Sequence, residues 1–302
     1  MSTRTTGPAP VTTAAPTVAA PPARRRVRPT RVVLVVVLVA LAALMMTPLA
    51  FALLASLSPL DQLLAGRGIL PERWEFSTYV DAWTRANFSR YFVNSVLVTG
   101  GVVVLDTIVS SMTAYVLARR RLRGQRALEA VYIATLFIGL TTAMLYPQYQ
   151  IARSLGIANL LGMTLVELAG VMIVHIFLIK AFVEGMGTEM EDAARVDGCG
   201  FFGTYWRIVF PLLTPILATT VILGFQASWN NYQVPLAFSL AAPDLRTLVV
   251  GVSALQYDAA DGIAAYNTVL AGATMALIPI IVVFVLLQRY FVQGWTEGAI
   301  KG

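Results

Sequence analysis

Long apolar runs constrain this chain more than any other feature of its sequence. A bilayer core about 30 Å thick needs about 20 mostly apolar residues per helix. Six runs of roughly this length predict transmembrane helices at about 32–57, 92–118, 128–146, 160–182, 211–238 and 268–291. A membrane β-barrel would instead show segments of about ten residues with alternating polarity. The sequence therefore predicts an all-α, polytopic membrane protein with six transmembrane helices.

The composition and the N-terminal segment agree with this prediction. Hydrophobic residues make up 57% of the chain and charged residues 13%, whereas soluble domains carry about 25% charged residues. The first apolar run is longer than the roughly 7 to 15 apolar residues of a signal peptide, which favours a retained membrane anchor. Residues 1–30, rich in Thr, Ala and Pro, are predicted to be a disordered cytoplasmic tail, followed by a transmembrane domain at 31–302.

Positive charge predicts the orientation of the chain in the membrane. Lys and Arg concentrate in cytoplasmic connections, and alternate connections here carry sixteen and six of these residues. Both termini fall on the richer side, so both are predicted to be cytoplasmic. The net charge of +6 follows from this topology, so membrane lipid is the expected partner and nucleic acid is not.

The residues needed for catalysis or metal binding are scarce. One cysteine and one histidine exclude a disulfide framework and argue against a metal site or a cofactor within the chain. A phosphate-binding Walker loop requires a Lys followed by Ser or Thr. Lys180 and Lys301 are followed by Ala181 and Gly302, so ATP would have to bind to another subunit. No catalytic residue is predicted.

Three ionisable residues lie at membrane depth, away from the ends of the predicted spans: Asp106, Glu167 and His175. Such residues at membrane depth often line a pore or relay ions. They also form hydrogen bonds between helices, or remain as neutral buried carboxyl groups. We favour this second interpretation for each of them, because no series of such residues outlines a proton path.

The connection between the fourth and fifth spans carries the most informative pattern. A short helix is predicted at about 188–198, where Thr188 and Glu191 have the spacing of a capping box. Gly198 suits a left-handed helix end. The adjacent small residues Ala193 and Ala194 would let another surface approach the backbone closely, so this helix is predicted to be a docking element.

An aromatic helical face follows this short helix. It combines Phe201, Phe202, Tyr205, Trp206 and Val209, and such a face suits the membrane interface. On physical grounds alone, the whole segment is equally consistent with an interfacial hairpin that joins two spans.

This segment resembles the EAA loop of ABC-importer permeases. The spacing of that motif is reproduced by Glu191 to Gly198, followed by Ile208 and then by Phe210 and Pro211. Three further segments are similar to the MalG-type permeases of carbohydrate importers: Trp74–Tyr79, Phe88–Ser95 and Gln288–Gly302.

The resemblance implies a permease domain at 31–302, with a coupling loop at 187–211. Its implied ATPase-coupling residues are Glu191, Asp192, Ala193, Ala194, Asp197, Gly198 and Pro211. Asp192 stands where the family usually has Glu, so either Asp192 or Glu191 is expected to make the ion pair with the ATPase.

The resemblance also implies the partners and the place of the chain in the cell. The expected partners are a second, non-identical permease, two ATPase subunits that bind ATP and Mg²⁺, and an extracellular solute-binding protein or lipoprotein. The expected location is the plasma membrane (inner membrane) of a bacterium, and the expected cargo is a carbohydrate or a related polyol.

A polar and aromatic run in the fifth span is the candidate solute pathway. It consists of Trp229, Asn230, Asn231, Tyr232 and Gln233, which offer amides and aromatic faces to a sugar; Asp106 is added as a further candidate. The alternative is an aromatic belt whose amides bond to neighbouring helices. Two other functions stay open, an ion-coupled secondary carrier and a membrane scaffold without a transport role.

Overall fold

The computed structural model describes residues 29–68, 70–85, 87–120, 122–137, 141–255 and 266–299. Nearly all of the predicted tail, residues 1–28, lies outside the described residues, as do 300–302. The chain divides into two compact units, residues 1–48 and 49–302. Helix α1, Pro29–Ser56, begins in the first unit and ends in the second.

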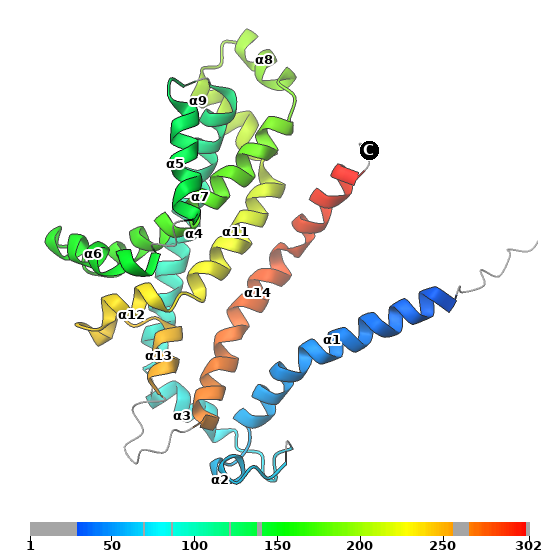
Figure 1. Ribbon diagram of the computed structural model, residues 1–302, viewed down its shortest axis with the longest axis vertical. Coiled ribbons are helices and arrows are strands. Elements are labelled where there is room, and N and C mark those ends of the chain that lie inside the picture. The colour runs from blue at the N-terminus through cyan, green and yellow to red at the C-terminus, as the bar shows by residue number, and fades with distance from the viewer. Residues whose placement is uncertain are drawn as a thin grey trace, which may run out of the picture. The chain divides into compact units, whose positions relative to one another are not determined.

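The described residues of the second unit form helices and no strands (Figure 1). The first helices are α2 (Leu60–Leu64), α3 (Ser77–Arg85), α4 (Phe88–Arg119), α5 (Gln125–Phe137), α6 (Thr141–Ser154) and α7 (Leu160–Gly185). They are followed by α8 (Glu189–Val196), α9 (Phe201–Thr204), the π-helix η1 (Tyr205–Val209), α10 (Phe210–Leu212) and α11 (Thr214–Trp229). The last are α12 (Gln233–Ser239), the 3-10 helix η2 (Pro243–Leu245), α13 (Leu248–Ala254) and α14 (Tyr266–Ala299).

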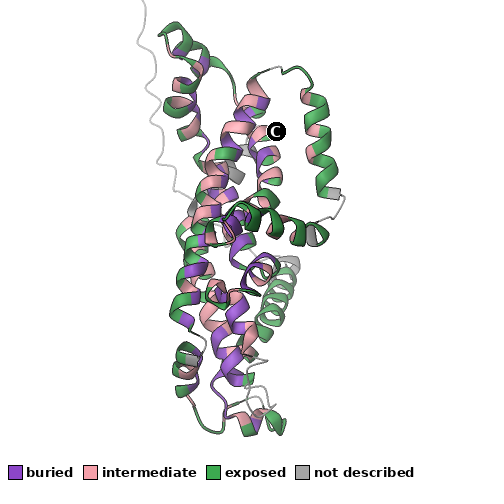
Figure 2. Ribbon diagram, turned by 90° about the vertical axis from the view of Figure 1, so that its left-hand side faces the viewer, coloured by how far each residue is buried: buried purple, intermediate pink, exposed green. Residues whose placement is uncertain are grey.

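Helix α4 is the central element of this unit. It packs along α7, and α11 packs against both α4 and α14. Buried residues run along the inner sides of these long helices, and exposed residues lie on the outer sides (Figure 2). Exposed positions of α4 include Val93, Leu97 and Val104. Apolar side chains on an outer surface suit a lipid environment, where the helix satisfies its own backbone polar groups.

Within the described ranges, four helical segments are long and apolar enough to cross a membrane: Val33–Ser56, Phe88–Arg119, Leu160–Gly185 and Tyr266–Gln288. They correspond to the first, second, fourth and sixth predicted spans. A fifth candidate is a bent pair, Phe201–Leu212 and Thr214–Trp229, whose halves meet at 77°.

Two predicted spans differ from the structure. The third, 128–146, is divided between α5 and α6, which flank residues 138–140; those three lie outside the described residues. The fifth, 211–238, is interrupted after Trp229, and α12 begins at Gln233. Asn230 and Asn231 occupy the break, because short amide side chains favour turns over helix interiors.

One glycine permits a close helix contact in this unit. Gly251 on α13 lies against the ring of Tyr91 on α4, and a Cβ at position 251 would overlap that ring. By contrast, a Cβ added at Gly100 on α4 would have no described atom within 4 Å.

The substitution Gly251→Ala is expected to lower the free energy of unfolding by about 1 to 3 kcal/mol, as overpacking of a filled interior does. Thermal unfolding in detergent, followed by size-exclusion chromatography, measures the effect. Gly100→Ala is the matched control and should unfold no earlier than the wild type. Equal unfolding temperatures for the two variants would contradict the contact.

Candidate functional site

The short helix α8 ends in a complete left-handed cap. Gly198 has φ +81°, a backbone conformation that glycine adopts without strain. The N–H of Gly198 donates to the carbonyl of Arg195 at 3.0 Å, and the N–H of Cys199 donates to that of Ala194 at 2.8 Å. These two bonds form a Schellman motif, so the predicted left-handed stop at Gly198 is confirmed.

The predicted capping box at the start of α8 is wrong. The side chain of Thr188 makes no capping hydrogen bond, and the Glu191 side chain turns toward α4 instead. Its Oε1 accepts from Nε of Arg119 at 2.8 Å, and its Oε2 accepts from the hydroxyl of Tyr115 at 3.0 Å. A guanidinium is a stronger partner for a buried carboxylate than a backbone N–H, which explains the outcome.

This geometry separates the two acidic candidates for ion pairing with an ATPase. Glu191 is only 2% exposed, and Arg119, its partner, also donates to the carbonyl of Met186 at 3.1 Å. Asp192 is exposed and pairs with Arg195 one turn along the same helix, at 2.8 Å. Glu191 therefore anchors α8 to α4, and Asp192 belongs to the outer face.

The outer face of α8 is apolar at its centre. Val196 is 88% exposed and Met190 60% exposed, and Ala193 and Asp197 are exposed as well. Ala194 is only 4% exposed. Of the two alanines, Ala193 alone is therefore open to another surface, and its docking role stays a prediction.

The aromatic residues after α8 point two ways. Phe201 stacks on Tyr115 with ring centroids 4.8 Å apart, and the hydroxyl of Tyr205 is 2.7 Å from that of Ser111 on α4. Phe202 and Trp206 are exposed. The segment is thus tied to α4 on one side and open on the other, rather than presenting one aromatic face to an interface. Pro211 lies in the first turn of α10, just before the 77° bend.

Asp106 and His175 form a buried contact between α4 and α7. Oδ2 of Asp106 lies 2.5 Å from Nδ1 of His175, and Oδ1 accepts from the hydroxyl of Ser110 at 2.7 Å. Both side chains are buried. This is the interhelical hydrogen bond that we favoured from the sequence, and the assignment of Asp106 to a solute pathway stays a prediction.

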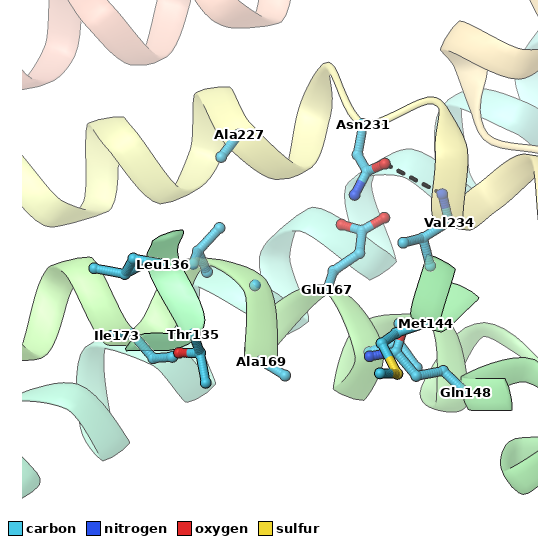
Figure 3. Close-up of a pocket in the computed structure, with 13 residues that line it drawn as sticks. Thr135, Leu136, Met144, Gln148, Glu167, Ala169, Ile173, Ala227, Asn231 and Val234 are labelled. Atoms are coloured by element: carbon cyan, nitrogen blue, oxygen red, sulfur yellow. Dashed lines mark hydrogen bonds between the residues drawn. The ribbon is translucent and has the colours of Figure 1, made fainter. Parts of the chain in front are cut away.

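Glu167 links α7 to α11 in a second polar contact. The hydroxyl of Ser228 lies 2.5 Å from its Oε2 and 3.3 Å from the hydroxyl of Thr99 on α4. Glu167 also lines a pocket of about 600 Å³ between α5, α6, α7, α11 and α12 (Figure 3). Asn231 lies on the opposite wall of this pocket, with its side chain pointing toward Glu167.

The other members of the predicted solute run have different surroundings. Trp229 is buried, donates from Nε1 to the carbonyl of Ala276 at 3.0 Å and stacks on Phe225. Its indole is therefore engaged in helix packing. The amide of Asn230 donates to the carbonyl of Gln226 at 3.0 Å.

Asn231 is the one residue of the run that lines the described pocket. Tyr232, directly before α12, and Gln233, the first residue of α12, are exposed. The predicted solute set thus divides into a packing residue, a turn and a single pocket-lining side chain.

The anchoring residues Tyr115 and Arg119 were missed from the sequence. They lie four residues apart at the end of α4, on one helix face. That spacing was visible, but it named no partner, because the contact with Glu191 joins residues 72 positions apart along the chain.

Residues 15–297 match the family described as "Binding-protein-dependent transport system inner membrane component". The chain belongs to this family. This permease is therefore a multi-pass inner-membrane protein, and the resemblance of the chain to ABC-importer permeases is confirmed.

Two curated relatives agree with this family assignment. The chain is 33% identical to the melibiose/raffinose/stachyose import permease protein MelC of Bacillus subtilis over 79% of this chain and 85% of that protein. It is 32% identical to the arabinooligosaccharide permease AraQ of Halalkalibacterium halodurans, over 84% and 91%.

The fold resembles the crystal structure of a bacterial ABC transporter involved in the import of alginate. The TM-score is 0.75 at 25% identity, over 87% of this chain and 96% of that one.

Removal of the buried anchor should release α8. The substitution Arg119→Ala leaves the carboxylate of Glu191 without its charged partner, which costs about 3 to 5 kcal/mol for a buried pair. The labelling rate of Cys199, which directly follows the cap of α8, reports this release and is expected to rise.

The matched control is Arg195→Ala, which removes the exposed pair with Asp192 and should change the rate little, since such pairs contribute about 0 to 1 kcal/mol. If Cys199 reacts no faster in Arg119→Ala than in the wild type, Glu191 does not hold the helix.

Proposed function

We propose that this permease is one of two pore-forming subunits of an ABC importer that carries a carbohydrate or a related polyol into the cell. The second permease is a different chain, two ATPase subunits bind ATP and Mg²⁺, and an extracellular solute-binding protein or lipoprotein delivers the solute. The chain itself performs no covalent chemistry. The observation that carries the proposal is α8, which is fixed on its inner side by Glu191 and exposes Met190, Ala193 and Val196 on its outer side.

The topology belongs to the same proposal. Six spans result if α5 and α6 contribute the third crossing and the bent pair contributes the fifth. The distribution of Lys and Arg then places both termini and α8 in the cytoplasm, where an ATPase subunit is located. Ala193, Val196 and Asp197 would meet that subunit, and the exposed Asp192 is a better partner for it than Glu191.

Two sets of contacts would transmit a displacement of α8 to the helices that form the pore. The first runs through Glu191 and Arg119 to the end of α4. The second runs along the chain through α9, η1 and α10 to α11, and Tyr205 ties this path to α4 as well. Since α4 and α11 both contact α7 or α14, displacement of α8 would act on the whole helix packing.

An ion-coupled carrier fits the geometry less well. The candidate for an ion relay, Asp106, has hydrogen-bond partners on both carboxyl oxygens within the protein. A scaffold without transport would leave the anchored and exposed helix α8 with no partner. The carbohydrate cargo rests on relatives whose names specify import of melibiose, raffinose and arabinooligosaccharides.

The coupling role predicts a strong effect at Val196. Introduction of a charge by Val196→Asp should abolish co-purification of the ATPase subunits and ATP-dependent uptake, because an unpaired charge in a desolvated interface is unfavourable. The matched control is Leu122→Asp, which changes an exposed leucine in the neighbouring predicted cytoplasmic connection. Normal uptake in Val196→Asp would overturn the coupling role.

The energy source and the cargo are tested together in proteoliposomes that contain the whole complex and its binding protein. With the binding protein outside the vesicles, uptake of melibiose, raffinose or arabinooligosaccharides is expected to require ATP inside them, on the side of the ATPase subunits. Uptake should persist when ionophores collapse ion gradients. Uptake that stops with the ion gradients and ignores ATP would favour the secondary carrier.

A further inference from the structure

The pocket at Glu167 contains an incompletely satisfied carboxyl group. Glu167 is 4% exposed, and its Oε1 is buried without a hydrogen-bond partner among the described residues. Its other oxygen, Oε2, already forms the contact to Ser228 on α11. The link between α7 and α11 therefore uses one carboxyl oxygen and leaves the other available.

A buried polar atom without a partner is costly, at about 1 to 3 kcal/mol. An interhelical bond alone could be made by Ser, Thr or Asn without this cost. The position of the carboxyl group on the wall of a pocket, facing Asn231 (Figure 3), supplies a reason for it, because a molecule in the pocket could donate a hydrogen bond to Oε1.

The chemistry of the walls defines the class of that molecule. Glu167 is the sole ionisable side chain among the described lining residues, and the other polar ones are Thr135, Gln148 and Asn231. A bound metal cation would need more oxygen ligands of negative charge. Amides and a hydroxyl both donate and accept, which suits a neutral molecule with several hydroxyl groups.

The remaining walls are aliphatic, including Met144, Val171 and Val234. Such walls can contact the C–H faces of a sugar ring. The volume of about 600 Å³ lies within the range of about 300 to 1,000 Å³ that is usual for small-molecule sites.

We propose that Glu167 is a solute contact of this permease: its free oxygen Oε1 accepts a hydrogen bond from a hydroxyl of the passing sugar, and Asn231 and Gln148 bond to neighbouring hydroxyls. This inference rests on the proposed function. It assigns part of solute recognition in the membrane to this subunit. The pocket lacks an aromatic platform among its described residues, so the contact is weak, as a transport pathway requires for release.

The test uses the complete importer with its binding protein in proteoliposomes, with melibiose, raffinose and arabinooligosaccharides as probes. Glu167→Met preserves length and removes the acceptor. It should lower the amount of sugar taken up per ATP hydrolysed by about fivefold, the effect of one lost hydrogen bond, while ATP hydrolysis stimulated by the binding protein persists. A role limited to helix packing would instead lower uptake and hydrolysis together.

The matched control is Glu184→Met on the same helix, where the glutamate is half exposed and pairs with Lys180 at 3.0 Å. Its ratio of uptake to hydrolysis should equal that of the wild type. An unchanged ratio in Glu167→Met, or an equal fall in both variants, would overturn the proposal.

A second measurement covers the case in which Glu167→Met does not fold. Ala227 lines the same pocket and is exposed, and Cys199 is the one cysteine of the sequence. In Cys199→Ala with Ala227→Cys, the transported sugar and the binding protein should slow labelling of position 227 by a thiol reagent during turnover.

Labelling that the sugar does not change would show that solute bypasses the pocket and would overturn the inference alone. A wild-type complex that takes up none of the three probes overturns the carbohydrate part of the proposed function, and the inference falls with it.

Discussion

The structure depends on helix α4 and on the polar contacts that fix other helices to it. In a lipid environment apolar surfaces gain little from contact with each other, so close packing and hydrogen bonds must select the arrangement. Asp106 joins α4 to α7 through His175, and Thr99 joins it to α11 through Ser228. At its end, Arg119 joins α4 to α8 through Glu191. These contacts occur at three levels along one helix, so α7, α11 and α8 are all fixed to the same support.

The parts of the fold set by local sequence were predictable. Four apolar runs coincide with long helices because length and hydropathy decide helix formation in a membrane. The end of α8 was predictable for a similar reason, since Gly198 takes a left-handed conformation that its neighbours disfavour. The break in the fifth predicted span was not, because apolar composition alone does not distinguish a continuous helix from two that meet at an angle.

The candidate site was harder to predict, because its contacts join distant residues. Glu191 had the spacing of a capping residue, but the chain brings Arg119 and Tyr115 beside it, and that tertiary contact overrides the local preference. In the same way Trp229 is a residue type that often binds sugars, but its Nε1 donates to the carbonyl of Ala276 and its ring stacks on Phe225. Glu167 was visible in the sequence, whereas its free oxygen could be found only from the structure.

The bend before α11 has a mechanical consequence. Leu213 at the corner is buried, and hydrogen bonds from Leu213 to Val209 at 3.0 Å and from Leu217 to Leu213 at 2.9 Å continue the backbone through it. The two helical segments, Phe201–Leu212 and Thr214–Trp229, meet at 77°, which is close to a right angle. A displacement of Phe201–Leu212 along its own axis would therefore move α11 almost perpendicular to the α11 axis. Such a movement changes the spacing between α11 and the helices packed against it.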